Sequence, residues 1–492
     1  MEQLLTDWLS HPEYWFSPTH QYDSYITQTY QHLFSQSHPP SLATIILHDQ
    51  VARHVYRDQH DKIYQHLALA LAHRSQLPPP TDPLQWTFYN LPVRHEGNPR
   101  KIIQVLHAAW DKLKKNPTQE THLLNFLKAT YKHLPDEPTF LELNTQHPVE
   151  FNTFNDYLDI LDHCPLEFQG NHRKSLLYQV FDQYLKKHRF QRIIISLSGG
   201  VDSQVCSYLL KLLSDKYHYD LVALHINYNN RVLREAEFVQ DWCCFLDIPC
   251  YTRHLHEIQR KPCMEYNLRD TYETYTRNVR FNAYKTLQGD VFLGHNEDDT
   301  FENILTNIAH KSKYDNLRGM AETQFLDQIP FHRPLLRIPK HSIYQYAKHV
   351  GIPYLKDSTP NWSQRGIIRD TVRPTLEKWE PTIVDAFFDL SDAMQEYDAL
   401  ATAYLSNLPI QELPNNAYQV HVPTPLITSR RLWSKLFERL QIHCSHKSMN
   451  NFMEIVVKQK NNKINIHKHV QIHQDSNTFT ILPMASNESS SE

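Results

Sequence analysis

The chain has 492 residues, of which 40% are hydrophobic and 21% are charged, so it is long enough for two to four globular domains. Its formal net charge of −4 excludes a globally basic surface and leaves only local patches for nucleic acid. Seven cysteines without a C-x-x-C spacing argue against a disulfide framework, a zinc ribbon or an iron–sulfur site. No apolar run is long enough to cross a bilayer and no signal-peptide pattern occurs, so we expect a cytoplasmic protein without membrane contact.

The N-terminal third of the sequence, residues 1–165, has the pattern of a wholly helical region. Apolar residues at mostly helical spacing predict one helix over 41–73, with Ser41 as its N-cap. Prolines between 78 and 83 separate this helix from the next, which we expect at about 100–113. Long helices joined by proline-rich turns are typical of a bundle or a stacked helical array.

Three strings in this region resemble the DUF924 family of helical domains, which have a TPR-like fold and no established activity: Tyr14–Phe16, HDQVARHVYRD at 48–58 and FYNLPVRHEG at 88–97. The chain keeps several residues of the family pattern: Asp49, Gln50, Arg53, Leu91, Pro92, His95 and Glu96. It departs at Val51, Ala52, His54 and Gly97. Two interpretations stay open for a polar subset, a functional site or a hydrogen-bonded network that locks helices together: Asp49, Arg53, His95 and Glu96.

Glycine use changes near residue 170, because all nine glycines except Gly97 lie between 170 and 366. The same window contains strand-like apolar runs at 192–196, 221–226, 249–255 and 291–295. They alternate with helical stretches at about 203–216, 233–246 and 270–288. This alternation predicts βαβ units in a parallel sheet, with ligands bound at the carboxyl ends of the strands.

One segment of this window, RIIISLSGGVDSQVCSYLLK at 192–211, predicts a strand, a tight loop and a helix. Two glycines and several hydroxyl side chains open the helix, so free backbone N–H groups and the helix dipole favour an anion such as phosphate. The chain has no Gly-Lys pair, which excludes a Walker loop. An ordinary turn between strand and helix is the alternative.

The string SGGVDS closely resembles the pyrophosphate-binding loop of the PP-loop superfamily of N-type ATP pyrophosphatases, whose fold is adenine nucleotide α-hydrolase-like. Members of that superfamily cleave ATP between its α and β phosphates, adenylate a substrate and release pyrophosphate. The resemblance implies that Asp202 helps to ligate Mg²⁺ carried by ATP. It also implies which residues hold the pyrophosphate: Ser198, Gly199, Gly200, Val201 and Ser203.

A second polar cluster, LGHNEDDTFENILTNI at 293–308, follows the last predicted strand and continues as a helix. Asp299 and Glu302 are three residues apart and therefore lie on one helical face. Two carboxylates at this edge could bind an ammonium group or, with Asp202, a divalent ion. The alternative is that the acidic residues simply stabilise the helix N-terminus.

Six strings in order resemble the motifs of the tRNA(Ile)-lysidine synthetases, a branch of the PP-loop superfamily. They are HINYNNR at 225–231, ETYTRNVRF at 273–281, HNEDDTFE at 295–302, NLRGM at 316–320, RPLL at 333–336 and DSTPNWSQRGIIRDTVRPTL at 357–376. The chain departs from the family pattern at four positions that bear on the identity of the acceptor: Tyr228, Thr300, Asn303 and Gly366.

This resemblance implies roles for further residues. His225 would contact ATP and His295 would lie by the reacting phosphate, while Asp299 and Glu302 would receive the amines of lysine. Arg277 would act at the catalytic centre. The arginines that would serve phosphates of ATP or tRNA are Arg231, Arg277, Arg280, Arg365 and Arg369.

Beyond residue 384 the sequence predicts a helix at 385–405 and short β-like runs at 417–422 and 464–482. A basic segment at 430–468 either contacts an RNA backbone or forms a solvated helix face. The last residues have the composition of a disordered tail. The predicted fold is multidomain, with an all-α TPR-like domain, a central α/β parallel-sheet PP-loop ATPase domain, a small α+β C-terminal domain and the tail: residues 1–168, 169–383, 384–483 and 484–492.

The resemblance implies an ATP-dependent ligase that adenylates the O2 of a cytidine in tRNA and couples lysine to it, with release of AMP and pyrophosphate. A cytidine oxygen is a poor leaving group until it is adenylated, and an amine must lose its proton before it attacks. Two other functions remain open. One is a PP-loop enzyme with a different base or small-molecule acceptor, and the other is a non-catalytic RNA-binding scaffold whose helical domain docks a protein partner.

Overall fold

The computed structural model describes residues 1–11, 20–115, 120–170, 173–228, 233–309, 319–357, 363–442, 444–457, 463–467 and 470–483. The chain divides into two compact units, which are treated separately below. The first unit comprises Met1–Gly294, Phe325–His332 and Tyr344–Lys356. The second unit comprises His295–Gln324, Arg333–Ile343 and Asp357–Glu492.

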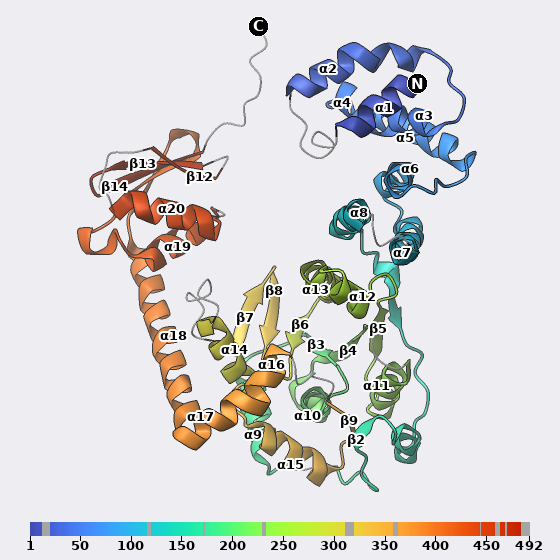
Figure 1. Ribbon diagram of the computed structural model, residues 1–492. Coiled ribbons are helices and arrows are strands. Elements are labelled where there is room, and N and C mark those ends of the chain that lie inside the picture. The colour runs from blue at the N-terminus through green and yellow to red at the C-terminus, as the bar shows by residue number, and fades with distance from the viewer. Residues whose placement is uncertain are drawn as a thin grey trace. The chain divides into compact units, whose positions relative to one another are not determined.

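The N-terminal region of the first unit is helical, as predicted (Figure 1). Its elements are α1 (Glu2–Ser10), α2 (His20–Tyr30), the 3₁₀ turn η2 (Gln31–Ser35), α3 (Leu42–Ile46), the π-helical turn η3 (Leu47–Val51), α4 (Ala52–Val55), α5 (His60–Ser75), α6 (Pro83–Glu96), α7 (Pro99–Lys115) and α8 (Glu120–His133). Ser41 is the predicted N-cap, because its Oγ accepts a hydrogen bond from the backbone N–H of Thr44 at 3.1 Å.

The prediction of one continuous helix over 41–73 was wrong. A π-helical turn at Leu47–Val51 and a break after Val55 divide this stretch into several pieces. A π-turn inserts an extra residue into the helix and is often found where a polar side chain must be re-aimed. Here the turn contains Asp49, whose side chain is buried and bonded to His95 at 2.8 Å.

Helix α6 was missing from the prediction because prolines stand inside it. Pro83 occupies its first turn, where a proline is tolerated, and Asp82 caps it by accepting a hydrogen bond from the N–H of Gln85 at 2.9 Å. Pro92 lies within the helix. The helix ends at Gly97, which has a left-handed φ of 77°.

The expectation of a wholly helical region up to 165 was also wrong. After α8 the chain forms the 3₁₀ turn η5 (Pro138–Phe140), β1 (Leu141–Leu143), the 3₁₀ turn η6 (Phe151–Tyr157) and β2 (Leu161–His163). Strand β1 pairs antiparallel with β5 (Cys250–His254), and β2 pairs antiparallel with β9 (Tyr354–Leu355). Both strands have only three residues, too few for a period-2 pattern to identify them.

The predicted parallel sheet is confirmed. The seven-stranded sheet has the order β1-β5-β4-β3-β6-β8-β7, and β5, β4, β3, β6 and β8 are mutually parallel neighbours. The remaining strands of this sheet are β3 (Arg192–Ser196), β4 (Asp220–Asn227), β6 (Asp290–Phe292), β7 (Thr323–Leu326) and β8 (Ile329–His332).

Helices connect these strands in the βαβ manner. The connecting helices are α10 (Val201–Tyr217), α11 (Leu233–Phe245), α12 (Arg260–Glu265) and α13 (Arg269–Leu287). Two further helices, α9 (Leu176–Lys187) before β3 and α15 (Lys340–Val350) after β8, flank these units in the chain. In Figure 1, α10 and α11 lie on one side of the central strands, and α12 and α13 lie on the other. This arrangement places the residues that follow β3, β4 and β6 at the carboxyl edge of the sheet.

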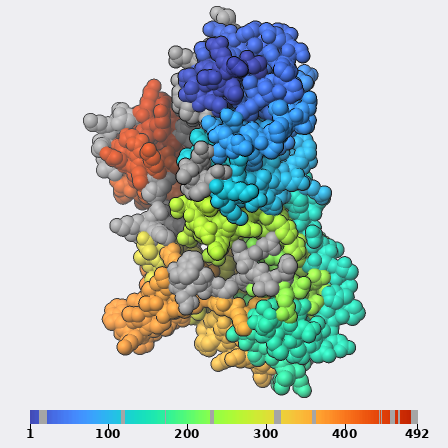
Figure 2. Space-filling model, turned by 45° about the vertical axis from the view of Figure 1, so that its right-hand side comes forward, coloured from blue at the N-terminus to red at the C-terminus, as the bar shows by residue number. Residues whose placement is uncertain are grey.

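The helical region and the parallel sheet of the first unit share one hydrophobic core. Buried side chains of this core run from Leu4 and Trp110 in the helical region to Ile194 and Phe331 in the sheet. Figure 2 shows the cyan surface of the helical region in direct contact with the green surface of the sheet domain. No helix of the described residues is long and apolar enough to span a membrane.

The second unit contains α14 (Glu297–Ala309), α16 (Gln364–Ile367), the π-turn η8 (Ile368–Val372), α17 (Arg373–Trp379) and α18 (Ile383–Asn407). Its C-terminal part is a small α+β domain, as predicted. The elements of that domain are β10 (Ile410–Leu413), the 3₁₀ turn η9 (Pro414–Asn416), β11 (Ala417–His421), the 3₁₀ turn η10 (Thr424–Leu426), α19 (Arg430–Arg439), α20 (His446–Val457), β12 (Lys463–His467), β13 (Val470–Asp475) and β14 (Thr478–Pro483). The strands form an antiparallel sheet of order β10-β11-β14-β13-β12 over a core that includes Trp433 and Phe479.

Candidate functional site

The loop Ser198–Ser203 joins β3 to α10 and is held in one shape by its own hydroxyl groups. The backbone N–H of Ser198 donates to Ser203 Oγ at 3.2 Å, and Ser203 Oγ donates to the carbonyl of Gly200 at 3.0 Å. The hydroxyls of Ser198 and Ser203 lie 3.1 Å apart. These bonds fix the backbone of the loop before any ligand arrives, which lowers the entropy cost of binding.

Glycine is required at two positions around the loop. Gly199 has a left-handed φ of 83°, and a Cβ there would lie 2.5 Å from Leu355 Cδ1. Its carbonyl accepts a hydrogen bond from the N–H of Leu355 at 3.0 Å. Gly294 packs against the first turn of α10, since a Cβ there would lie 2.9 Å from the backbone carbon of Asp202. Larger residues would push the loop out of place.

The N-terminus of α10 has the features of an anion site. Gly200 is its N-cap, and no side chain of the described chain caps the first turn. The N–H groups of this turn and the positive end of the helix dipole are therefore suited to phosphate oxygens. Ser198 is exposed and Asp202 is half-buried, so the loop is accessible from solvent.

His225 lies near the carboxyl end of β4 and is fixed by a backbone contact. Its Nδ1 lies 2.9 Å from the carbonyl of Leu197, so Nδ1 carries the proton and donates this bond. The side chain is 6% exposed. The contact ties His225 to the residue that precedes the SGGVDS loop.

Helix α13 carries the predicted Arg277 and Arg280. Arg280 donates from Nη1 to the hydroxyl of Tyr228 at 3.5 Å, a long hydrogen bond. Tyr228 therefore contacts one of the predicted phosphate-binding arginines, at a position where the lysidine synthetase pattern has histidine. Arg277 is exposed and lies over the ring of Phe281 at 4.3 Å. The predicted Arg231 lies outside the described residues.

In the second unit, Asn296 and Asp299 cap the start of α14 reciprocally. Asn296 Oδ1 accepts a hydrogen bond from the N–H of Asp298 at 2.9 Å, and Asp299 Oδ2 accepts one from the N–H of Asn296 at 3.1 Å. This cap fixes the start of the helix and the direction of Asp299. Glu302 follows one turn later on the same face, as the spacing predicted.

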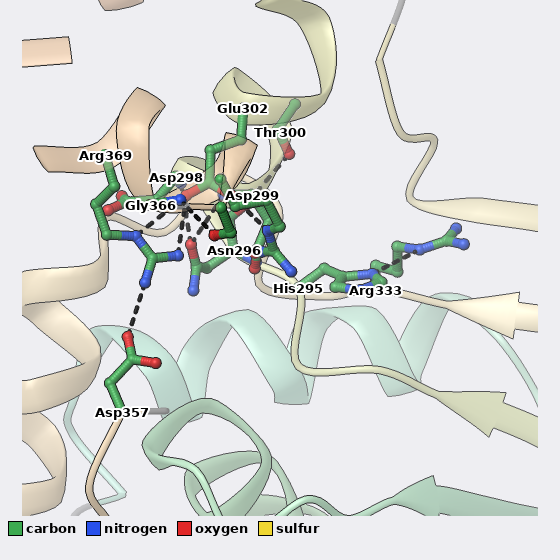
Figure 3. Close-up of polar contacts among 12 residues, drawn as sticks. His295, Asn296, Asp298, Asp299, Thr300, Glu302, Arg333, Asp357, Gly366 and Arg369 are labelled. Atoms are coloured by element: carbon green, nitrogen blue, oxygen red, sulfur yellow. Dashed lines mark hydrogen bonds and ion pairs between the residues drawn. The ribbon is translucent and has the colours of Figure 1, made fainter. Parts of the chain in front are cut away.

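The structure brings Asp299 and Glu302 together with Arg365 and Arg369. Figure 3 shows Arg369 between Glu302 and Asp357. Arg365 donates from Nε to Glu302 Oε2 at 2.7 Å and also pairs with Asp299. Arg369 donates to Glu302 Oε1 at 2.9 Å and to Asp357 Oδ2 at 2.8 Å. We call these five residues the α14 charge cluster.

The two sides of the α14 charge cluster differ in exposure. The carboxylate side chains are nearly buried, with Glu302 at 5% and Asp299 at 12% exposed, whereas Arg365 is 55% exposed. Burial acts to lower the pKa of the Arg365 guanidinium, but the carboxylates of Asp299 and Glu302 outweigh it and raise that pKa. The carboxylates thus form a cation-binding pair, and a guanidinium that reaches in from solvent is the cation they hold here.

His295 lies just before α14 and is contacted by Arg333, whose Nε donates to His295 Nδ1 at 3.2 Å. Arg333 is 4% exposed and also donates to the carbonyl of Ala321 at 2.9 Å. No role was predicted for Arg333, although it is the first residue of the string RPLL. The capping role of Asn296 was not predicted either, because a cap can be assigned only once the first residue of the helix is known.

A third arginine of the C-terminal motif has a structural contact. Arg373 pairs with Asp298 at 3.0 Å and with Glu377 at 2.7 Å, and its guanidinium lies over the ring of Phe301. Within the described ranges, no group of three or more His, Cys, Asp or Glu side chains could hold a metal ion.

The basic segment of the C-terminal domain is partly used inside the domain. Arg431 and Lys435 both pair with Asp398 of α18, and Arg439 donates to the carbonyl of Leu405. These contacts hold α19 on α18. The arginines of α19 thus have structural partners, so the interpretation of this helix as a purely RNA-facing surface loses support.

Two family models match the chain. Residues 174–377 match the PP-loop domain, and residues 4–157 match the bacterial protein family of unknown function DUF924. Among solved structures, a U34-tRNA thiolase from Methanococcus maripaludis aligns with a TM-score of 0.36 and 17% identity over 47% of this chain and 85% of that chain.

Curated relatives match the PP-loop part. A tRNA(Ile)-lysidine synthase of Nitrosomonas europaea is 28% identical over 240 residues, which cover 45% of this chain and 51% of the relative. The tRNA(Ile)-lysidine synthase of Enterococcus faecalis is 26% identical over 211 residues, which cover 41% of this chain and 44% of the relative. The chain spans about half the length of these curated relatives. It therefore carries a DUF924 region followed by a PP-loop domain of the kind found in tRNA(Ile)-lysidine synthases.

Proposed function

We propose that the protein is an ATP-dependent tRNA-modifying ligase that resembles tRNA(Ile)-lysidine synthetase. The observation that carries the proposal is the SGGVDS loop, fixed by its own hydroxyls and ending at the uncapped first turn of α10. The relatives named tRNA(Ile)-lysidine synthase support the same class of reaction. ATP and tRNA are the substrates of this proposal, and lysine is the favoured nucleophile.

The proposed reaction has two steps. In the first, the cytidine O2 attacks the α phosphorus of ATP, the bond to the β phosphate breaks and pyrophosphate leaves. In the second, the lysine ε-amine attacks C2 of the base, the C2–O2 bond breaks, AMP leaves and the amine loses a proton. Adenylation converts a poor leaving group into a good one.

The loop residues would hold the departing pyrophosphate. The backbone N–H groups of the first turn of α10, from Val201 to Ser203, and the dipole of this helix favour the negative charge that develops on it. Mg²⁺ bound to ATP would neutralise further charge, and Asp202 would be its protein ligand. His225 would help to position the nucleotide, because its donated bond to Leu197 fixes its ring next to the start of the loop.

The carboxylates of the α14 charge cluster would receive lysine. Asp299 and Glu302 already hold a cation, the guanidinium of Arg365, and an ammonium group has the same charge. Arg365 reaches them from solvent and can turn away, after which it and Arg369 could face phosphates of ATP or tRNA. His295, Arg277 and Arg280 complete the proposed set as residues near the reacting phosphates.

The primary test is an assay of the purified chain with tRNA, Mg²⁺, ATP and lysine. We expect release of AMP and pyrophosphate, and lysine bound to the tRNA. Asp202→Asn should abolish pyrophosphate release while tRNA binding persists. Asp220→Asn, at a solvent-exposed position on β4, is the matched control and should keep full activity. Folded protein that releases neither product would overturn the proposal.

A different acceptor is the second candidate, and four departures from the family pattern favour testing it. Tyr228 contacts Arg280, Thr300 donates to the carbonyl of Asn296, and Asn303 accepts from Asn307. Gly366 is buried on α16. Exchange of pyrophosphate into ATP measures the adenylation step alone, so it should require tRNA and no amino acid if the first candidate holds. Exchange that requires a member of a panel of amino acids and amines, in the absence of tRNA, would favour the second candidate.

A further inference from the structure

A groove in the DUF924 region lies between α6 and α8. Apolar side chains form its floor: Leu84, Phe88 and Leu91 on α6, and Phe126 and Ala129 on α8. On each helix these residues follow helical spacing, so they face one side. The groove offers about 150 Å³ of space. A cavity of roughly this size admits a molecule as large as benzene.

Arg94 lines the same groove and has no acidic partner of its own. Its one side-chain hydrogen bond among the described residues goes from Nη2 to His95 Nε2 at 3.2 Å. No carboxylate in the described part of the chain lies within ion-pair distance of it. Burial lowers the pKa of this guanidinium, yet a guanidinium does not lose its proton in proteins. A partly buried cation without a counter-ion is costly.

The surrounding charges leave a positive excess. Asp49 is the nearby carboxylate, and it is already bonded to His95 at 2.8 Å and to Arg53 at 3.5 Å. His95 is neutral when it donates from Nδ1 to Asp49 and accepts from Arg94 at Nε2. Arg53 and Arg94 thus share one negative charge, so a single added anion would balance the cluster.

Glu96 does not take part in this cluster. It pairs with Lys101 at 2.6 Å instead. The other three residues that the sequence singled out, Arg53, His95 and the buried Asp49, do form a network, and Arg94 extends it to the wall of the groove. The network therefore both locks helices together and ends in a cation that faces an apolar space.

We propose that the groove between α6 and α8 binds a small amphipathic carboxylate, with its carboxyl group on Arg94 and its apolar body on Phe88, Leu91 and Phe126. A planar carboxylate matches the paired donors of a guanidinium, and one carboxylate supplies one negative charge. The space limits the apolar body to a ring or a short aliphatic chain. The site is independent of the ATP chemistry proposed for the PP-loop domain.

The test uses the full chain and titrates it with benzoate and hexanoate, with benzamide as the neutral counterpart. Binding is followed by ligand-observed NMR and calorimetry. We expect saturable binding of at least one carboxylate and at least ten-fold weaker binding of benzamide. Arg94→Met should reduce carboxylate affinity at least ten-fold, and Arg94→Lys should reduce it less. Arg100→Met, at an exposed position of the same region, is the control and should bind normally.

A second variant tests the groove independently, in case Arg94→Met does not fold. Ala129→Leu keeps Arg94 and fills the groove, so it should also remove binding while the thermal unfolding temperature stays close to that of the parent. The proposal is overturned if folded parent protein binds neither carboxylate, if benzamide binds as well as benzoate, or if both variants bind like the parent.

Discussion

Two charge clusters of this protein have the same chemistry and opposite surroundings. The α14 charge cluster pairs Asp299 and Glu302 with an arginine that is 55% exposed. In the first unit, Arg253 pairs with Glu257 at 2.6 Å and with Asp136 at 3.1 Å, and all three side chains are at most 10% exposed. We call this second set the β5 charge cluster.

The β5 charge cluster ties the DUF924 region to the PP-loop domain. Tyr275 of α13 donates to Glu257 Oε1 at 2.7 Å. Tyr131 of α8 donates to the carbonyl of Glu257 at 2.7 Å and accepts from Trp110 Nε1 of α7 at 2.8 Å. Every partner in this network is buried, so none can be exchanged for a ligand. The α14 charge cluster differs because its cation enters from solvent.

We infer from this difference that exposure of the cation, and not the presence of an ion pair, marks a cluster that can receive a substrate. A fully buried pair that loses one member leaves an uncompensated charge. An exposed cation regains its hydration when it leaves, and a positively charged ligand can then take its place beside the carboxylates. The β5 cluster should therefore control stability, and the α14 cluster should control activity.

The largest expected effect is on stability at the β5 charge cluster. Glu257→Ala should lower the free energy of unfolding by about 3–5 kcal/mol, because it removes one of the two carboxylates that balance the buried Arg253 and leaves the Tyr275 hydroxyl without its acceptor. The matched control is Glu273→Ala, since Arg269 and Glu273 form an exposed pair at the same spacing and should lose less than about 1 kcal/mol. Urea unfolding measures both, and equal losses would contradict the comparison.

The next effect is on activity at the α14 charge cluster. Glu302→Gln should lower the rate of lysine-dependent AMP release by about 100-fold or more, because a neutral amide neither holds an ammonium group nor assists loss of its proton. Its free energy of unfolding should fall by only about 1 kcal/mol, since Arg365 and Arg369 can turn to solvent. A large loss of stability with unchanged activity would give this cluster a structural role instead.

A third polar cluster consists of histidines, and we expect it to make the stability of the protein depend on pH. His48 stacks on His66 and His73, and burial lowers the pKa of His48 to about 4, with His66, His73 and His38 adding to the effect. Burial also lowers the pKa of His66, and the charge of Lys62 adds to this effect.

Because the folded pKa of His48 lies below its usual value near 6.5, the unfolded chain binds the proton first. Stability is therefore fully present above about pH 6.5 and falls as the pH drops towards about 4. Urea unfolding at several pH values measures this decline, and His48→Gln should flatten it. A decline of the same slope in His48→Gln would remove His48 from the explanation.

The smallest effect is the response to salt. Raising the ionic strength from about 0.1 M to about 1 M shortens the screening length from roughly 10 Å to roughly 3 Å. The stability cost of Glu302→Gln should shrink by a few tenths of a kcal/mol, since its partner Arg365 is exposed. The cost of Glu257→Ala should stay the same. An equal response of the two variants would show that exposure does not separate the clusters.

Local signals in the sequence predicted the parts of the fold that depend on neighbouring residues. The strand at 192–196, the loop at Ser198–Ser203 and the helix after it are encoded in one continuous stretch, and the structure confirms the strand and the helix. The spacing of Asp299 and Glu302 placed them on one helical face for the same reason.

The parts that depend on distant residues could not be predicted. Strands β1 and β2 exist because β5 and β9 supply their hydrogen-bond partners, and neither has a pattern of its own. The pairing of Asp299 and Glu302 with Arg365 and Arg369 joins positions more than sixty residues apart, and the motifs predicted separate roles for the carboxylates and the arginines. The role of Arg94 could not be predicted for the same reason, since its lack of an acidic partner among the described residues is a property of the folded chain.

The most direct test of the proposed function is the nucleoside content of tRNA from cells that carry the intact gene and from cells that carry Asp202→Asn. Mass spectrometry of the digested tRNA measures it. Our account predicts a lysine-bearing cytidine that is present with the intact gene and absent with the variant, while the two proteins accumulate to the same level. Identical modified nucleosides in the two samples would contradict it.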